Sequence, residues 1–290
     1  MNINIFKNIG KYFTHQPPCS GRVASSAKML GIKGSEAQRT QLAGELNDKF
    51  FKIIDDEFVR KAANKEKAEL SKKELVGCIK QVVPNVKINV KYINDPMSFG
   101  YLEKTINKGK NTVDGFVLGL EGAVKKGEDH VVLRHEMRHF FDYMTQPKLA
   151  ARSNTAAIIA KLGKGSESSV SSHLDVYSDL LYQPKTFEDN QAEISVLAKK
   201  LNGYFKSMRT PAEEKIEILQ KWRSGLKTEL NAYTDEAKFA CKDSPDKYWK
   251  ENAADYLFKD KIKLVEQALK DAISAVRKES ALKFGPKASN

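Results

Sequence analysis

Residues 135–139 read His-Glu-Met-Arg-His, which is an HExxH pattern. On an α-helix, two residues four positions apart lie on one face, about 6 Å apart along the axis. Two imidazoles at that spacing can share one tetrahedral metal ion, so the pattern requires a helix at this point of the chain. Apolar residues at 131–133 and 140–141 indicate that the other faces of this helix are buried. We predict a helix from about Asp129 to Met144, ended by Pro147.

The same pattern predicts a zinc site with hydrolytic chemistry. Zinc lowers the pKa of a water to about 7, so a neighbouring carboxylate can accept its proton at neutral pH. We predict that His135 and His139 bind Zn²⁺ and that Glu136 is the catalytic general base. Only 5 of the 290 residues are histidine, so HExxH would arise by chance in roughly one such chain in a hundred or fewer. Arg138 is charged where such motifs usually carry an uncharged residue, which indicates either a rim position or a decayed site.

On these residues the chain resembles the zincin metallopeptidases, and among them the Glu-zincins, whose arrangement is thermolysin-like. It is similar to small bacterial effector zinc proteases of that type. The zincin branch with a third histidine ligand fits less well, because Thr145 and Asp142 stand where that branch has its third ligand and a glycine. The resemblance implies a zincin-like fold, hydrolysis of peptide bonds in a protein substrate, and a third metal ligand on a later helix.

The resemblance also implies that this third ligand is a glutamate in an E-x-x-A pattern. The segment 228–233 offers Glu229, and the segment 251–255 offers Glu251, with Asp255 four positions on. A residue four positions after the ligand can orient a histidine of the site. We expect Glu229, because the helix that contains it has a strong start at Thr210-Pro211-Ala212-Glu213. Glu251 is the alternative.

Zincins bind extended substrate by strand addition to an edge strand that precedes the active helix. The resemblance gives this role to Gly115–Glu121, and we expect a protein substrate to bind along that segment. A donor that stabilises the oxyanion is needed as well. The candidates are Tyr233, His173 and Tyr177.

The rest of the chain predicts an α+β protein, predominantly helical and zincin-like, with a small sheet next to the HExxH helix. Apolar spacings of three and four predict helices, and apolar–polar alternation predicts strands. Ser71 with Glu74 is a capping box, and Pro84 ends the helix that follows it. The predicted elements are helices at about 36–70, 72–83, 173–182, 211–239 (interrupted or bent at Gly225) and 248–278, and strands at 86–92 and 115–121.

The predicted domain organisation is one zinc-metalloprotease domain over 36–280, with a flexible arm at 1–35 and a flexible tail at 281–290. The arm is either an ordinary frayed terminus or an export signal. The three cysteines show no CxxC spacing, and no run resembles the apolar core of a secretory signal peptide. These features, with the resemblance, predict export without a Sec signal into a host cytosol; otherwise the protein is expected to be cytoplasmic.

The chain has 49 Lys and Arg against 37 Asp and Glu, a net charge of +12. Such a charge favours acidic partners, yet no aromatic residues interleave with the lysines as a nucleic-acid platform would require. We expect no nucleic acid as partner, and no apolar run has the ~20 residues of a membrane span. The alternative to a protease is a non-catalytic helical binding protein with a relict site, which would use its basic surface to bind acidic partners.

Overall fold

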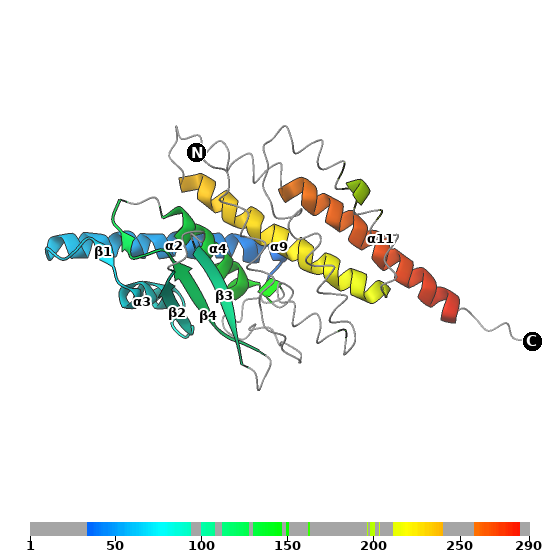
Figure 1. Ribbon diagram of the computed structural model, residues 1–290, viewed down its shortest axis with the longest axis horizontal. Helices are drawn as coiled ribbons and strands as arrows, with labels where there is room; N and C mark the ends of the chain where they lie inside the picture. Colours follow the sequence, from blue (N-terminus) through cyan, green and yellow to red (C-terminus); the bar gives the residue numbers. More distant parts are fainter. Residues whose placement is uncertain are drawn as a thin grey trace, which may run out of the picture.

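The computed structural model describes residues 34–93, 100–107, 112–127, 130–146, 149–150, 162, 196, 198–200, 203, 211–239 and 258–284. These residues form a mainly helical α+β structure with small sheets (Figure 1). The predicted fold class is therefore confirmed at this level. The arm at 1–33, the helix predicted at 173–182 and the segment with Glu251 lie outside the described residues.

The first two helices begin at capping boxes. α2 (Glu36–Ala63) follows Ser35, whose side chain pairs with Gln38, and α3 (Lys72–Val82) follows Ser71, which pairs with Glu74 as predicted. α2 ends earlier than the predicted residue 70, because Lys65 takes a left-handed conformation with φ of 57°. The residues after that turn form β1 (Glu69–Leu70), which pairs antiparallel with β5 (Val124–Lys125).

The larger sheet corrects one prediction. Its order is β2 (Ile88–Tyr92), β4 (Thr112–Leu120) and β3 (Gly100–Asn107), with β2 parallel and β3 antiparallel to β4. The predicted segment Gly115–Glu121 therefore belongs to the central strand up to Leu120, and residues 116–120 are paired on both sides. Its side chains are buried without a break over 116–120, which is typical of a central strand. The prediction that it is an edge strand was wrong; within the described residues the edge beside α4 is β3, which the sequence analysis did not identify.

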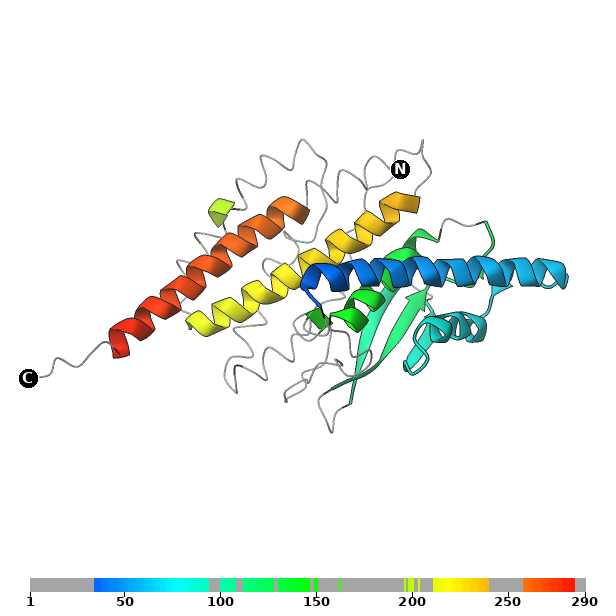
Figure 2. The ribbon, with the colours of Figure 1, turned by 180° about the vertical axis from the view of Figure 1, so that it is seen from behind.

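The helix with the HExxH pattern is α4 (Val131–Thr145), close to its predicted bounds. It lies at the centre of the molecule, where it packs against α2, α9 and the strands β3 and β4 (Figures 1 and 2). Its apolar face closes a core shared with α2, α3 and the sheet. Fully buried members of this core include Phe50, Ile54, Phe116, Leu118 and Phe140. α4 is thus fixed on several sides, which makes it a rigid support for a site.

Two long helices complete the fold, of which the first packs against α4 and the second packs against the first. α9 (Ala212–Phe239) crosses α4 and is continuous through Gly225, so the predicted interruption there was wrong. α11 (Lys259–Phe284) lies along α9, and Figures 1 and 2 show the two side by side. Trp222, Phe258 and Val265 are buried in this part of the protein. No described helix combines the length and the apolar character that a membrane crossing needs.

Candidate metal centre

Three buried side chains converge where α4 and α9 cross. His135 and His139 come from adjacent turns of α4, and Glu229 comes from the middle of α9. The Nε2 atoms of the two histidines are 3.0 Å apart. Each of them lies 3.4 Å from one carboxylate oxygen of Glu229. The three residues therefore form a group that could hold a metal ion.

The spacing of these atoms can be compared with the needs of zinc. Ligand bonds of 2.0–2.1 Å in a tetrahedron place the ligand atoms about 3.3 Å from one another. The two Nε2 atoms are 3.0 Å apart, near that value, and each lies 3.4 Å from a different oxygen of Glu229, Oε2 toward His135 and Oε1 toward His139. Two imidazoles and one carboxylate are also the donor set of zinc sites that keep a fourth position for a water or a substrate. The donor set thus suits zinc, and the carboxylate lies close enough to both histidines to share an ion with them.

Hydrogen bonding within the group points the same way. Within the described residues, the buried Glu229 Oε2 has no hydrogen-bond partner. A buried polar atom without a partner is costly unless an ion or a water satisfies it. The carboxylate of Glu229 is consistent with a metal ligand, because the charges of His139 and His135 overcome burial and hold its pKa well below the usual range.

His135 is held by a second carboxylate. Its Nδ1 contacts Glu236 Oε1, while its Nε2 points to Glu229 and His139. The contact with Glu236 places a proton on Nδ1 and leaves the Nε2 lone pair for a metal. Burial lowers the pKa of His135, but the two carboxylates outweigh burial and raise it well above its usual value. Binding of a metal at Nε2 must therefore displace a proton when His135 is charged.

Aromatic rings support both histidines. The Tyr233 ring packs edge-to-face against His135, with centroids 5.2 Å apart, and Tyr143 stacks on His139. Tyr233 is the residue four positions after Glu229, where the resemblance placed an orienting group. Tyr233 packs its ring against His135, whereas the carboxylate of Glu236 contacts His135 Nδ1.

Glu136, the predicted base, is half-buried next to the group. Burial raises the pKa of Glu136 above its usual value, and the charges of His135 and His139 oppose that shift. A raised pKa suits a general base, since proton transfer is most efficient when the pKa of the base lies near the working pH. Gly100, at the start of β3, lies against the same helix. A Cβ atom at Gly100 would collide with Val132 and would lie 3.7 Å from Glu136 Cγ.

The charge of Arg138 was predicted to indicate either a rim position or a decayed site. Arg138 is 4% exposed, so it is not at a rim. Its guanidinium contacts Asp235 Oδ2 at 2.8 Å, Asp142 Oδ2 at 3.3 Å and the carbonyl of Thr40 at 3.0 Å. A buried arginine with two carboxylates and a carbonyl has its donors satisfied. The charge therefore gives no sign of a decayed site.

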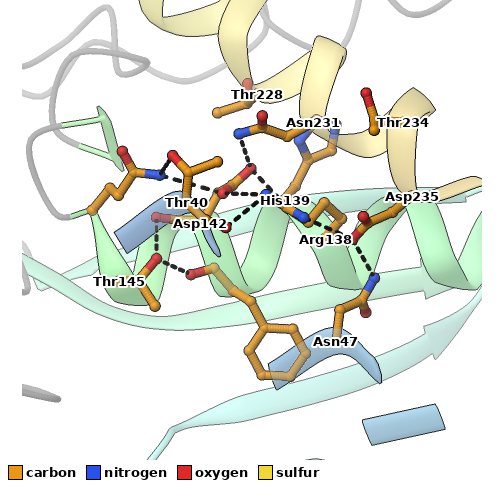
Figure 3. A network of polar contacts seen from close by, with 12 residues as sticks. Thr40, Asn47, Arg138, His139, Asp142, Thr145, Thr228, Asn231, Thr234 and Asp235 are labelled. Carbon is orange, nitrogen blue, oxygen red and sulfur yellow. Dashed lines mark hydrogen bonds and ion pairs between the residues drawn. The ribbon is translucent and has the colours of Figure 1, made fainter. Parts of the chain in front are cut away.

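Further polar contacts extend from this arginine, and Figure 3 shows them together. Asn231 donates to Asp142 Oδ2 at 3.0 Å, and Asn47 donates to Asp235 Oδ2 at 3.3 Å. Gln146 also donates to Asp142, at 3.4 Å. We use the name polar clamp for the five residues Asn47, Arg138, Asp142, Asn231 and Asp235.

The structure brings His135, His139 and Glu229 together and leaves the rival Glu251 outside the described residues, with His173 and Tyr177. The sequence analysis missed Glu236 and Asp235. Glu236 was open to detection, since it stands seven positions after Glu229 and seven residues make nearly two helical turns. Asp235 gave no such signal, because its partner Arg138 lies 97 residues away.

Comparison of the chain with models of protein families, with curated proteins and with solved structures finds no match. The candidate site therefore rests on the sequence pattern and on the geometry of the described residues.

Proposed function

We propose that this protein is a zinc metalloprotease in which His135, His139 and Glu229 bind the ion and Glu136 is the general base. The observation that carries the proposal is the convergence of the three ligand groups, whose ligand atoms lie within 4.8 Å of one another, beside Glu136. Zinc, when bound, supplies a Lewis acid that polarises a carbonyl and lowers the pKa of water. A zincin-like arrangement of α4, α9 and the sheet is part of this proposal.

The residues of the chain divide the remaining tasks. Glu136 accepts the proton of the attacking water and returns it to the departing amine, as general acid–base catalysis requires. Glu236 keeps the proton of His135 on Nδ1, so that Nε2 stays available as a ligand. Burial and three neighbouring carboxylates raise the pKa of Tyr233 well above its usual value, so its hydroxyl stays a donor at neutral pH. Tyr233 is the candidate for the oxyanion donor within the described residues.

The substrate is a protein in extended form, and the strand proposed to bind it is β3 in place of β4. β3 is the edge of the sheet beside α4 within the described residues, and Gly100 at its start lies next to Glu136. Strand addition at this edge would place a peptide bond near the base. A glycine is required here because a side chain at Gly100 would collide with Val132.

The test measures zinc content and peptide cleavage on the same samples of wild type, Glu136→Gln, Glu229→Gln and Glu121→Gln. Elemental analysis should find about one zinc per chain in wild type, Glu136→Gln and Glu121→Gln, and little in Glu229→Gln. Cleavage of an unfolded protein, read by mass spectrometry, should fall by about 10²–10⁴-fold in Glu136→Gln. Glu121 is exposed and serves as the matched control.

Two outcomes would reject the proposal. If the wild type takes up no zinc from excess metal, the metal centre is rejected, and the alternative function, a binding protein with a relict site, is favoured. Cleavage that persists unchanged in Glu136→Gln would remove the assigned base.

Export into a host cytosol as an effector belongs to the same proposal. It predicts that residues 1–35 direct a fused reporter out of the cell. A reporter retained inside the cell would leave a cytoplasmic protease. If the protein binds nucleic acid with steep salt dependence, its function is instead binding through the basic surface.

A further inference from the structure

We infer that the polar clamp is a positioning device for the metal centre, and that Arg138 is its central positioning residue. This inference rests on the proposed metal site and adds a role for residues that bind neither metal nor substrate. The clamp joins the same two helices as the ligands and also joins α2 to them. Figure 3 shows Arg138 between Asp235 of α9 and Asp142 of its own helix.

The geometry follows from helical spacing. On α4 the ligands His135 and His139 are four residues apart, and so are the clamp residues Arg138 and Asp142. Residues at that spacing share a face, so α4 carries two parallel stripes. On α9, Glu229 and Glu236 are seven residues apart and both contact His135, while Asn231 and Asp235 are four apart and contact the clamp residues of α4. Glu229, the ligand on α9, is two positions from Asn231, and Glu236 is one position from Asp235.

This proximity gives the clamp control over the register of the helices. A slide of α9 by one residue moves it ~1.5 Å along its axis. Metal–ligand distances tolerate deviations of only about 0.2 Å. Arg138 Nη1 to Asp235 Oδ2 at 2.8 Å and Asn231 to Asp142 at 3.0 Å are short, directional contacts that oppose such a slide. The carboxylate of Glu229 is thereby held in reach of both histidines without a contribution from a metal.

α2 completes the clamp from the other side. Asn47 donates to Asp235 Oδ2, and the carbonyl of Thr40 accepts from Arg138 Nη2. Gly44 lies between them, and a Cβ atom there would be 3.0 Å from Arg138 Nη1. The absence of a side chain at this turn of α2 makes room for the guanidinium. A helix that carries no ligand thus takes part in positioning the site.

The experiment measures Co²⁺, a spectroscopically visible substitute that accepts the same nitrogen and oxygen ligands. In Arg138→Met with Asp235→Leu, the charged pair is replaced by apolar side chains together, so that of the two clamp carboxylates only Asp142 loses its cation, and it keeps its bonds from Asn231 and Gln146. Co²⁺ affinity should fall by about tenfold or more, with altered visible absorption, while the metal-free variant unfolds cooperatively. A purely structural pair would leave affinity and spectrum as in wild type.

A milder matched pair keeps the test decisive if the double variant does not fold. Asn231→Ala removes the amide that reaches Asp142, while Thr234→Ala removes a hydroxyl that donates within α9, to the carbonyl of Leu230. We expect weaker Co²⁺ binding in Asn231→Ala and wild-type binding in Thr234→Ala. Equal, wild-type binding in both would overturn the inference while wild type still binds Co²⁺. Wild type that binds no Co²⁺ would reject the proposed function and this inference with it.

Discussion

Two polar groups lie between α4 and α9, and they differ in how completely their atoms are paired. In the polar clamp, Asp142 accepts from Arg138, Asn231 and Gln146, and Asp235 accepts from Arg138, Asn47 and Lys238. Asn47 Oδ1 is its one buried side-chain atom without a partner among the described residues.

In the metal centre, by contrast, two Nε2 atoms face each other and one carboxylate oxygen lacks a hydrogen bond. Both groups are buried to a similar degree, so burial alone does not distinguish a structural cluster from a binding site. The two groups differ in how many of their buried polar atoms have hydrogen-bond partners. A buried group whose donors and acceptors match is complete, whereas a group with converging acceptors needs a cation. The predictions that follow test this contrast.

The largest effect is expected from breaking the clamp on one side only. Arg138→Met leaves Asp142 buried without its cation and Asp235 with Lys238 alone, and it should lower the free energy of unfolding of the metal-free protein by about 3–5 kcal/mol. Chemical denaturation measures this loss. Arg60 also meets two carboxylates, but its side chain is 45% exposed, and Arg60→Met should change little. Equal losses in the two variants would contradict the description of the clamp as a satisfied buried network.

Zinc is expected to stabilise the protein by binding the group of His135, His139 and Glu229. At a free concentration a hundred times the Kd, a ligand that binds only the folded state adds about 2.7 kcal/mol to the free energy of unfolding. Wild type and Glu136→Gln should both gain this increment in thermal unfolding, because Glu136 is not a ligand. Glu229→Gln should lose most of it. An undiminished gain in Glu229→Gln would mean that another residue, such as Glu251, is the third ligand.

Lys104 on β3 is intermediate between the polar clamp and the metal centre, because it is a buried amine that contacts the carbonyl of Ala150 and the ring of Tyr143. Burial, aided by the charge of Lys221, lowers the pKa of Lys104 to about 7 from an ordinary 10.5. Between these pH values the unfolded chain binds more protons than the folded one, so stability rises with pH.

The rise is expected to be about 1 kcal/mol per pH unit from pH 7 upward. Lys104→Met should lack this contribution and should be the more stable protein at pH 7. Denaturant melts of both proteins from pH 6 to 9 measure it, and parallel profiles would show that the folded protein does not depress the pKa of Lys104.

The smallest effect uses two helical glycines. Gly77 in α3 has open space around it, so Gly77→Ala should stabilise the protein by about 0.5–1 kcal/mol through helix propensity. Gly44→Ala gains the same propensity, but its Cβ would press on Arg138 Nη1 at 3.0 Å. The gain should therefore be reduced or lost. An equal gain at both positions, measured as thermal midpoints, would show that the guanidinium has room to shift.

The local elements of the fold could be predicted because their determinants are close together in the sequence. Ser71 and Glu74 form their capping box within one turn, and the helix around His135 follows from apolar residues on adjacent turns. β3 escaped prediction because Lys104 interrupts its apolar pattern, and that lysine is buried by tertiary contacts that include the ring of Tyr143 and the carbonyl of Ala150. β4 was assigned correctly as a strand but wrongly as an edge, since strand order depends on pairing between distant segments.

For the site, the sequence by itself determined which residues are the candidates for two ligands and the base, because His135, Glu136 and His139 occupy one helix whose geometry is set by the backbone. It narrowed the third ligand to two glutamates. Only the tertiary structure brought Glu229 to the histidines, assigned Glu236 to His135 and turned Arg138 into a buried partner of Asp235. Those contacts join residues about a hundred positions apart, and helical periodicity carries no information on which distant helix will cross, or in what register.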